Sequence, residues 1–286
     1  MLHEATFILG HIPIKTTNVF IRMFTIKPPP KQPKTWDTPD LPEPVFRIAI
    51  VSPSGSGKSV LLSNFISNPS FPYRELFKKN IFLFSSTFHL TDPSFAMSDN
   101  IPKKNVFENL DIGILDEIVR DQESIITSYG KERSPHVLIV FDDVGHQINY
   151  QATQYLKGLY FSARHKKISL IFLIQAYRSL PRAMRVNCTE MVFFQIANTG
   201  ERETIADEMP IDKRAFYAIL DDATEEPYSF LVVFNRNPMN KRFQKRFTGE
   251  WYNYRLSHSM PRNTNGVNTR ESDENDGNHG VGLTSL

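Results

Sequence analysis

A stretch of nine residues, SPSGSGKSV at positions 52–60, combines the groups that phosphate binding requires. Gly55 and Gly57 can adopt positive φ angles, which lets backbone N–H groups point at phosphate oxygens. Lys58 supplies a positive charge for the same phosphates, and the hydroxyl of Ser59 is a ligand for a metal ion. We therefore expect the stretch to hold the phosphates of a nucleotide.

An apolar run at residues 46–51 precedes this stretch, and the apolar pattern of a helix begins after it. Strand, glycine loop, Lys-Ser and helix is the layout of a P-loop, in which the helix directs its positive N-terminal end at the phosphates. Ser52 departs from the glycine of the usual pattern, and a plain Ser/Gly-rich turn is the alternative interpretation. The residues predicted to bind ATP are Ser52, Pro53, Ser54, Gly55, Ser56, Gly57, Lys58, Ser59 and Val60.

A second motif, HVLIVFDDV, occupies residues 136–144. A continuous apolar run suits a parallel strand buried on both faces, and an aspartate at its end is typical of the Walker B motif. We predict that Asp142, together with Ser59, holds Mg²⁺, and that Asp143 acts as the general base toward water. The alternative is that the two aspartates cap a turn into the next helix. A P-loop about 85 residues upstream favours the nucleotide site.

Gln175 follows another apolar run, at residues 168–174. If that strand lies between the two motif strands, the amide lies beside the carboxylates and can position the attacking water, since an amide both donates and accepts. The alternative is a glutamine that bonds exposed backbone. Residues 85–87 (Ser-Ser-Thr) follow a further predicted strand, 81–84, at its carboxyl end, which is the sheet edge where ligands bind.

Composition limits the classes of protein and site. The chain has 286 residues and a net charge of +2, so any contact with nucleic acid depends on local basic patches. Cys188 is its one cysteine, which excludes an internal disulfide framework and a multi-cysteine zinc site. Apolar runs reach about five residues, far short of the roughly 20 that span a bilayer, so no membrane span is predicted. We also expect that the protein is not secreted, because no basic segment leads into an apolar core near its start.

Three regions are predicted. Residues 1–45 carry eight of the 19 prolines and should form an extended arm, residues 46–256 form the P-loop ATPase domain, and residues 257–286 are expected to be disordered. Strand 228–234 is predicted to be the last. The basic segment 236–247 after it is interpreted as a solvated face rather than a phosphate contact. The predicted helices are 59–66, 110–129, 149–164, 201–208 and 212–220.

Two further stretches, SARHKKISLIFLIQ (162–175) and LPRAMRVNCTEMVFF (180–194), follow the nucleotide motifs. In this order the chain resembles the viral genome-packaging ATPases of the FtsK–HerA superfamily, over residues 47–234. The most similar groups are those of poxvirus-like large DNA viruses, virophages and polinton-type elements. The resemblance implies an α/β, RecA-like P-loop NTPase fold: a mostly parallel central sheet flanked by helices, with an additional strand between the Walker A and Walker B strands.

The same resemblance implies an activity and partners. It points to ATP-driven translocation of double-stranded viral DNA into a preformed capsid by a ring homo-oligomer, a hexamer or pentamer, that docks on a capsid or portal-vertex protein. The place of action would be the infected host cell, in a virus factory, the cytoplasm or the nucleus, or the virion. Gln175 takes the sensor position, and an arginine finger reaches the neighbour's ATP. Its candidates are Arg164, Arg182, Arg185 and Arg202, of which Arg185 is favoured.

Two other functions share the P-loop. A DNA pump of the plasmid or conjugation type would have the same active site and dock elsewhere. A small-molecule kinase would need an acceptor pocket and an Arg-rich lid, and its activity would not respond to DNA. The consecutive Asp142 and Asp143, with Gln175 after them, favour water as the acceptor and hence an ATPase. A non-enzymatic DNA-binding protein would need neither motif.

Overall fold

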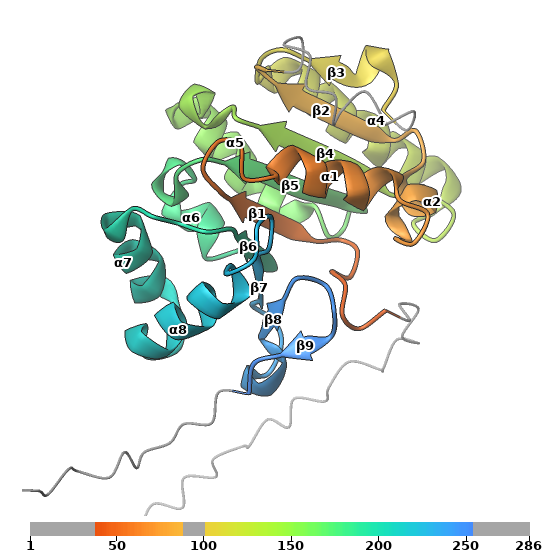
Figure 1. Cartoon of the computed structure of the whole chain (residues 1–286). Coiled ribbons are helices and arrows are strands. Elements are labelled where there is room, and N and C mark those ends of the chain that lie inside the picture. The colour runs from red at the N-terminus through yellow and green to blue at the C-terminus, as the bar shows by residue number, and fades with distance from the viewer. Residues whose placement is uncertain (1–37, 88–100, 254–286) are drawn as a thin grey trace, which may run out of the picture. The chain divides into compact units, whose positions relative to one another are not determined.

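The computed structural model describes residues 38–87 and 101–253, and the elements in these ranges belong to one compact unit that begins at Pro39. Its sheet has nine strands in the order β3-β2-β4-β5-β1-β6-β7-β8-β9 (Figure 1). The strands are β1 (Arg47–Val51), β2 (Ile81–Ser85), β3 (Val106–Phe107), β4 (Val137–Asp142), β5 (Ile168–Ile174), β6 (Glu190–Phe193), β7 (Leu231–Phe234), β8 (Phe243–Lys245) and β9 (Glu250–Trp251).

Strand β5 lies between β1 and β4, as the resemblance implied. The strands from β3 to β6 in the sheet order pair in parallel, and β7, β8 and β9 add antiparallel pairs at one side. Val51 is level with Ile174, and Asp142 is level with both Leu173 and Ser85. The carboxyl ends of four parallel strands therefore meet at one edge, which brings the predicted site residues together. The mostly parallel α/β fold is confirmed.

Helices cover both faces of the sheet. Ile48 and Ile50 on β1 contact the helix after the P-loop, whereas Ala49 and Val51 point into the larger core on the other face. Strands β4 and β5 are buried at every residue because both of their faces are covered. In Figure 1, α1 and α2 lie in front of the sheet. The helices are α1 (Lys58–Ser67), α2 (Tyr73–Phe77), α4 (Ile112–Tyr129), α5 (Tyr150–Ser162), α6 (Arg182–Arg185), α7 (Thr199–Glu208) and α8 (Lys213–Ala223).

Side-chain caps explain where several helices begin. Asp111 accepts from the backbone N–H groups of Gly113 (2.7 Å) and Ile114 (3.2 Å), so α4 begins at Ile112, after the predicted start at residue 110. Asn149 caps α5 in the same way through the N–H of Ala152. In the described ranges, no helix is both long and apolar enough to cross a bilayer.

The prediction that strand 228–234 is the last was wrong. Strands β8 and β9 follow it, and the side chains of Phe243 and Gln244 in β8 are fully buried. Phe243 and Gln244 are flanked by charged residues, so the segment has no apolar run that would predict a buried strand. The interpretation of 236–247 as a solvated face fails at these two buried positions. Pairing with β7 gives the segment its hydrogen bonds and apolar neighbours, which cannot be predicted from the residues of the segment alone.

The N-terminal boundary also differs from the predicted start at residue 46. The hydroxyl of Tyr73 donates to the carbonyl of Pro42 (2.6 Å), and the indole N–H of Trp251 donates to Asp40 (3.3 Å). Asp40 and Pro42 therefore belong to the compact unit that begins at Pro39. Most of the predicted arm (1–37) and the predicted tail (257–286) lie outside the described residues.

Candidate active site

A cavity of about 470 Å³ opens at the carboxyl edge of the sheet. It gathers most of the residues predicted from the sequence: the P-loop, both aspartates and the glutamine. A volume of this size suits a small ligand. The lining residues are Ser54, Gly55, Gly57, Lys58, Ser59, Val60, Thr87, Asp142, Asp143, Gln175 and Tyr228.

The loop has the backbone that its glycines allow. Gly55 (φ 78°) and Gly57 (φ 104°) are both left-handed, a region that side chains with a Cβ rarely adopt. Ser52, at the position where the usual pattern has glycine, has no positive φ and is fully buried. The departure at Ser52 therefore imposes no backbone strain. Because α1 begins at Lys58, its N-terminal N–H groups face the loop and favour an anion there.

Lys58 is held inside the loop. Its Nζ donates to the carbonyls of Ser52 (3.1 Å) and Pro53 (3.3 Å), and the side chain is buried. Burial lowers the pKa of Lys58, whereas the negative charges of Asp143 and Asp142 act to raise that pKa. The ammonium group thus lies between the phosphate loop and the two carboxylates, where it can bind the phosphates of a nucleotide.

Asp142, the last residue of β4, is oriented by hydroxyl groups at and just after the end of β2. Its Oδ2 accepts from Ser85 Oγ (2.8 Å) and from Thr87 Oγ1 (3.4 Å). Burial raises the pKa of Asp142, and the hydrogen bond from Ser85 opposes that rise. Ser85 and Thr87 were not among the predicted site residues. Their signal was the run of polar residues at the carboxyl end of a buried strand.

The donors present fit a magnesium ion that a nucleotide brings with it. The described residues contain no group of three or more His, Cys, Asp or Glu side chains that could hold a metal by themselves. Mg²⁺ is usually bound by one or two carboxylates, with water and substrate phosphates completing its shell. The carboxylate of Asp142 and the hydroxyl of Ser59, both at the cavity, match that set.

Asp143 and Gln175 are joined directly, as the predicted order of strands requires. Gln175 Nε2 donates to Asp143 Oδ2 (2.9 Å). Asp143 has φ 52°, a left-handed conformation that is uncommon for a residue with a side chain and often marks a functional position. The backbone carbonyl of Asp143 accepts a hydrogen bond from His146 Nδ1 (3.1 Å), and the backbone N–H of Asp143 donates to the carbonyl of Leu173 (3.1 Å). This backbone geometry places the carboxylate at the cavity.

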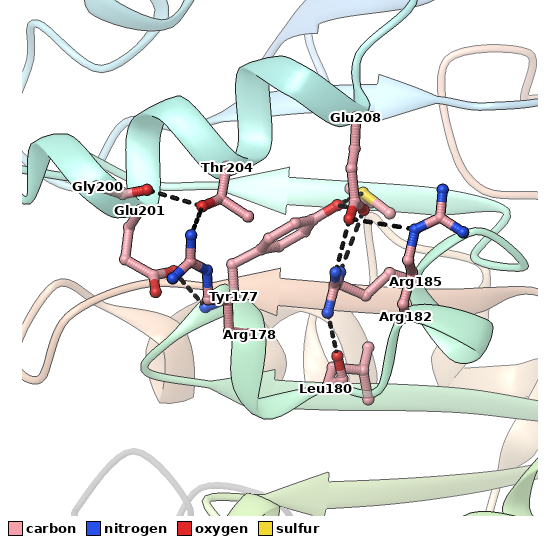
Figure 2. Close-up of polar contacts among 10 residues, drawn as sticks. Tyr177, Arg178, Leu180, Arg182, Arg185, Gly200, Glu201, Thr204 and Glu208 are labelled. Atoms are coloured by element: carbon pink, nitrogen blue, oxygen red, sulfur yellow. Dashed lines mark hydrogen bonds and ion pairs between the residues drawn. The ribbon is translucent and has the colours of Figure 1, made fainter.

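Arg185, by contrast, lies outside this cavity. Figure 2 shows Arg185 and Tyr177 both directed at the carboxylate of Glu208. Arg185 donates through Nη2 to Glu208 Oε1 (2.6 Å), through Nε to Oε2 (3.2 Å) and through Nη1 to the carbonyl of Leu180 (2.6 Å). Its side chain is 8% exposed and stacks over the ring of Tyr177. A guanidinium bonded in this way is poorly placed to reach a neighbouring subunit.

The other candidate arginines differ in how exposed they are and in how firmly they are paired. Arg202 is paired with Asp221 on α8 through two contacts of 2.7 and 2.9 Å. Arg182 is 76% exposed and only loosely paired, 3.8 Å from Glu208, and Arg164 is exposed. Arg182 and Arg164 therefore have the accessibility that a group acting on a partner needs.

The basic residues Lys166 and Lys167 lie before β5, at the opposite edge of the sheet from the cavity. Lys166 pairs with Glu123 (2.8 Å), and Lys167 Nζ donates to the carbonyl of Ser134 (2.7 Å). Both amines therefore make contacts within the chain, and neither contact involves the cavity.

Comparisons with known proteins identify the family of this chain. Residues 34–239 match the family described as Poxvirus A32 protein. The chain belongs to this family. The resemblance inferred from the sequence is thereby confirmed.

Curated relatives of the chain include poxvirus proteins. It is 27% identical over 180 residues to the DNA packaging protein OPG160 of vaccinia virus (strain Copenhagen), a match that covers 63% of this chain and 64% of that protein. It is 28% identical over 166 residues to the DNA packaging protein OPG160 of variola virus, with 58% of each chain covered. The chain thus spans less than two thirds of the length of these relatives.

Among solved structures, the chain resembles B204, the DNA-packaging ATPase from Sulfolobus turreted icosahedral virus. The TM-score is 0.50 at 15% sequence identity, and the match covers 67% of this chain and 93% of B204. At this identity the likeness concerns the fold, and it agrees with the P-loop NTPase architecture described above.

Proposed function

We propose that this chain hydrolyses ATP and uses the energy to move double-stranded viral DNA into a preformed capsid. The observation that carries the proposal is the convergence of Lys58, Asp142, Asp143 and Gln175 on one cavity in a chain of the Pox A32 family. The names of the relatives support DNA as the substrate, since they are DNA packaging proteins.

The site residues predicted from the sequence have distinct parts in hydrolysis. Lys58 and the N–H groups of the P-loop hold the phosphates. Ser59 and Asp142 would hold Mg²⁺, which neutralises charge on the phosphates when it is bound. Ser85 keeps the carboxylate of Asp142 in one orientation through its hydrogen bond. An ordered carboxylate loses less conformational entropy when a metal binds.

Asp143 takes the proton of the attacking water. Because Gln175 Nε2 bonds to Oδ2 of Asp143, Oδ1 is the oxygen that we assign as the proton acceptor. Gln175 is then also positioned to sense the γ-phosphate, because its amide lies beside both the general base and the cavity.

The partners belong to the same proposal. The chain acts as a ring of identical subunits, a hexamer or pentamer, on a capsid or portal-vertex protein. Its place of action is the infected host cell, in a virus factory, the cytoplasm or the nucleus, or the virion. The cavity is accessible from outside, since Val60 and Tyr228 at its rim are 51% and 71% exposed. Among the candidate arginines, Arg182 and Arg164 are exposed enough to complete a neighbour's site, whereas Arg185 would first have to leave Glu208.

The test is ATP hydrolysis by the purified chain, with and without linear double-stranded DNA. We expect DNA to stimulate hydrolysis, Lys58→Ala to abolish it, and Asp143→Asn to slow it about 10²- to 10⁴-fold. Lys104→Ala and Asp121→Asn are matched controls, because both side chains are exposed and lie outside the cavity. These controls should keep the stimulated rate.

Other results would favour other functions. Hydrolysis that ignores DNA would contradict the motor for the isolated chain. Transfer of the γ-phosphate to a small molecule, indifferent to DNA, would identify a kinase. Stimulation by DNA without any binding to capsid or portal-vertex protein would favour a pump of the plasmid or conjugation type.

A further inference from the structure

Tyr228 combines two uncommon features. It lies between α8 and β7 with φ 61°, a left-handed conformation that costs free energy for a bulky side chain. Its side chain is also 71% exposed, so burial of the ring does not repay that cost. Strain of this kind at an exposed aromatic residue suggests a function for the ring.

The position of Tyr228 gives the function. It lines the phosphate cavity and also a second cavity of about 400 Å³. Its ring packs against the P-loop, since a Cβ on Gly57 would lie 3.1 Å from Tyr228 Cδ1. Pro53 and Ser56 of the loop form part of the second cavity. A ligand with its phosphates at Lys58 can therefore extend past the ring of Tyr228 into that cavity.

The second cavity has groups suited to a planar, polar ring. Phe194 contributes an apolar wall, and the exposed side chains of Gln195 and Glu225 contribute polar groups at the rim. The volume is within the range of small-ligand sites. Aromatic side chains stack on any nucleobase, because every base has a π face.

We propose that Tyr228 is the stacking platform for the base of the bound nucleotide and that the second cavity holds this base. The inference rests on the proposed nucleotide function. It gives a binding place to the base of the nucleotide, whereas the P-loop binds the phosphates. Tyr228 is thus a positioning residue for the nucleotide, and its effect is on affinity for the base.

Calorimetry on the full chain can separate the base from the phosphates, with Mg²⁺-ADP and Mg²⁺-tripolyphosphate as the two ligands. We expect Tyr228→Ala to weaken ADP binding about 5- to 150-fold, the range of one stacking contact, and to leave tripolyphosphate binding unchanged. Tyr228→Phe should bind ADP like the native chain. Tyr150→Ala is the matched control, since Tyr150 is 80% exposed and lies on α5 outside both cavities.

Tyr228→Gly is a second variant, because glycine adopts the observed φ without strain and keeps the loop folded. It should lose ADP affinity like the alanine variant. Unchanged ADP affinity in both variants would overturn the proposal. Equal loss of ADP and tripolyphosphate would overturn it too, because Tyr228 would then act through Gly57. If the native chain binds neither ligand, the proposed nucleotide function fails along with the platform.

Discussion

Replacing Glu208 by alanine removes the carboxylate that neutralises Arg185 and accepts a hydrogen bond of 2.7 Å from Tyr177. The variant separates two roles for Arg185. If the arginine stabilises its own chain, loss of Glu208 must lower the free energy of unfolding. If it serves a neighbouring subunit, loss of Glu208 should matter little for stability.

The magnitude follows from the burial of the two partners. Removing one member of a buried ion pair costs about 3–5 kcal/mol, because the other charge stays buried without compensation. Arg185 is 8% exposed but Glu208 is 17% exposed, so water can reach part of the gap and the lower end applies. The hydroxyl of Tyr177 loses its acceptor as well, which adds about 1 kcal/mol. We expect a total loss of about 4 kcal/mol.

Urea denaturation measures this loss. The matched control is Asp221→Ala, which removes the carboxylate from the two-point pair with Arg202 in the same part of the chain. Asp221 is 59% exposed, so the control should cost about 0.2–1 kcal/mol. The double variant Arg185→Met with Glu208→Leu should be more stable than Glu208→Ala, because it leaves no charge buried.

A loss in Glu208→Ala no larger than that in Asp221→Ala would refute this reasoning. So would an Arg185→Met variant that keeps its stability and loses ATP hydrolysis while Glu208→Ala stays active. That pattern would restore Arg185 as the arginine finger predicted from the sequence.

Three further predictions concern the general base Asp143, the pH dependence of stability and strand β8. Asp143→Asn should bind Mg²⁺-ADP normally in calorimetry yet hydrolyse ATP about 10²- to 10⁴-fold more slowly, as loss of a general base requires; weakened ADP binding would contradict this. Burial raises the pKa of Glu190 to about 7, so its contribution to stability is present below its ordinary pKa and is lost as pH rises through 7. Glu190→Gln should therefore gain stability relative to the native chain between pH 5 and pH 8 in urea denaturation. Burial lowers the pKa of His136 to about 4, and His136 therefore affects stability in the opposite direction. His136 is present in both proteins, so its effect cancels when the native chain and Glu190→Gln are compared at the same pH. A stability difference between them that does not vary with pH would contradict the prediction for Glu190. Phe243→Ala should cost about 3–5 kcal/mol in the same assay, and the exposed Lys241→Ala close to nothing, because Phe243 is fully buried in β8; equal effects would contradict the strand.

The P-loop and the strands β4 and β5 could be predicted from the sequence because their signals are local. An apolar run covered on both faces reads as unbroken hydrophobic residues, and it ends where Asp142 or Gln175 begins. Glycines mark the loop because its backbone angles exclude most other residues. Asp143 and Gln175 could be placed together on the condition that the strand before Gln175 lies between the two motif strands, an order that the family resemblance implied and the structure has.

The tertiary structure alone decided the features that depend on distant partners. Strand β8 forms because it pairs with β7, and Phe243 is fully buried there. The charged residues around Phe243 give the segment no apolar run that would predict a strand. Arg185 is buried because Glu208, 23 residues further along the chain, lies against it. The sequence around an arginine shows its charge but not the carboxylate that will face it. Since the free energy of a buried charge depends on that partner, only the folded chain separates a structural arginine from a catalytic one.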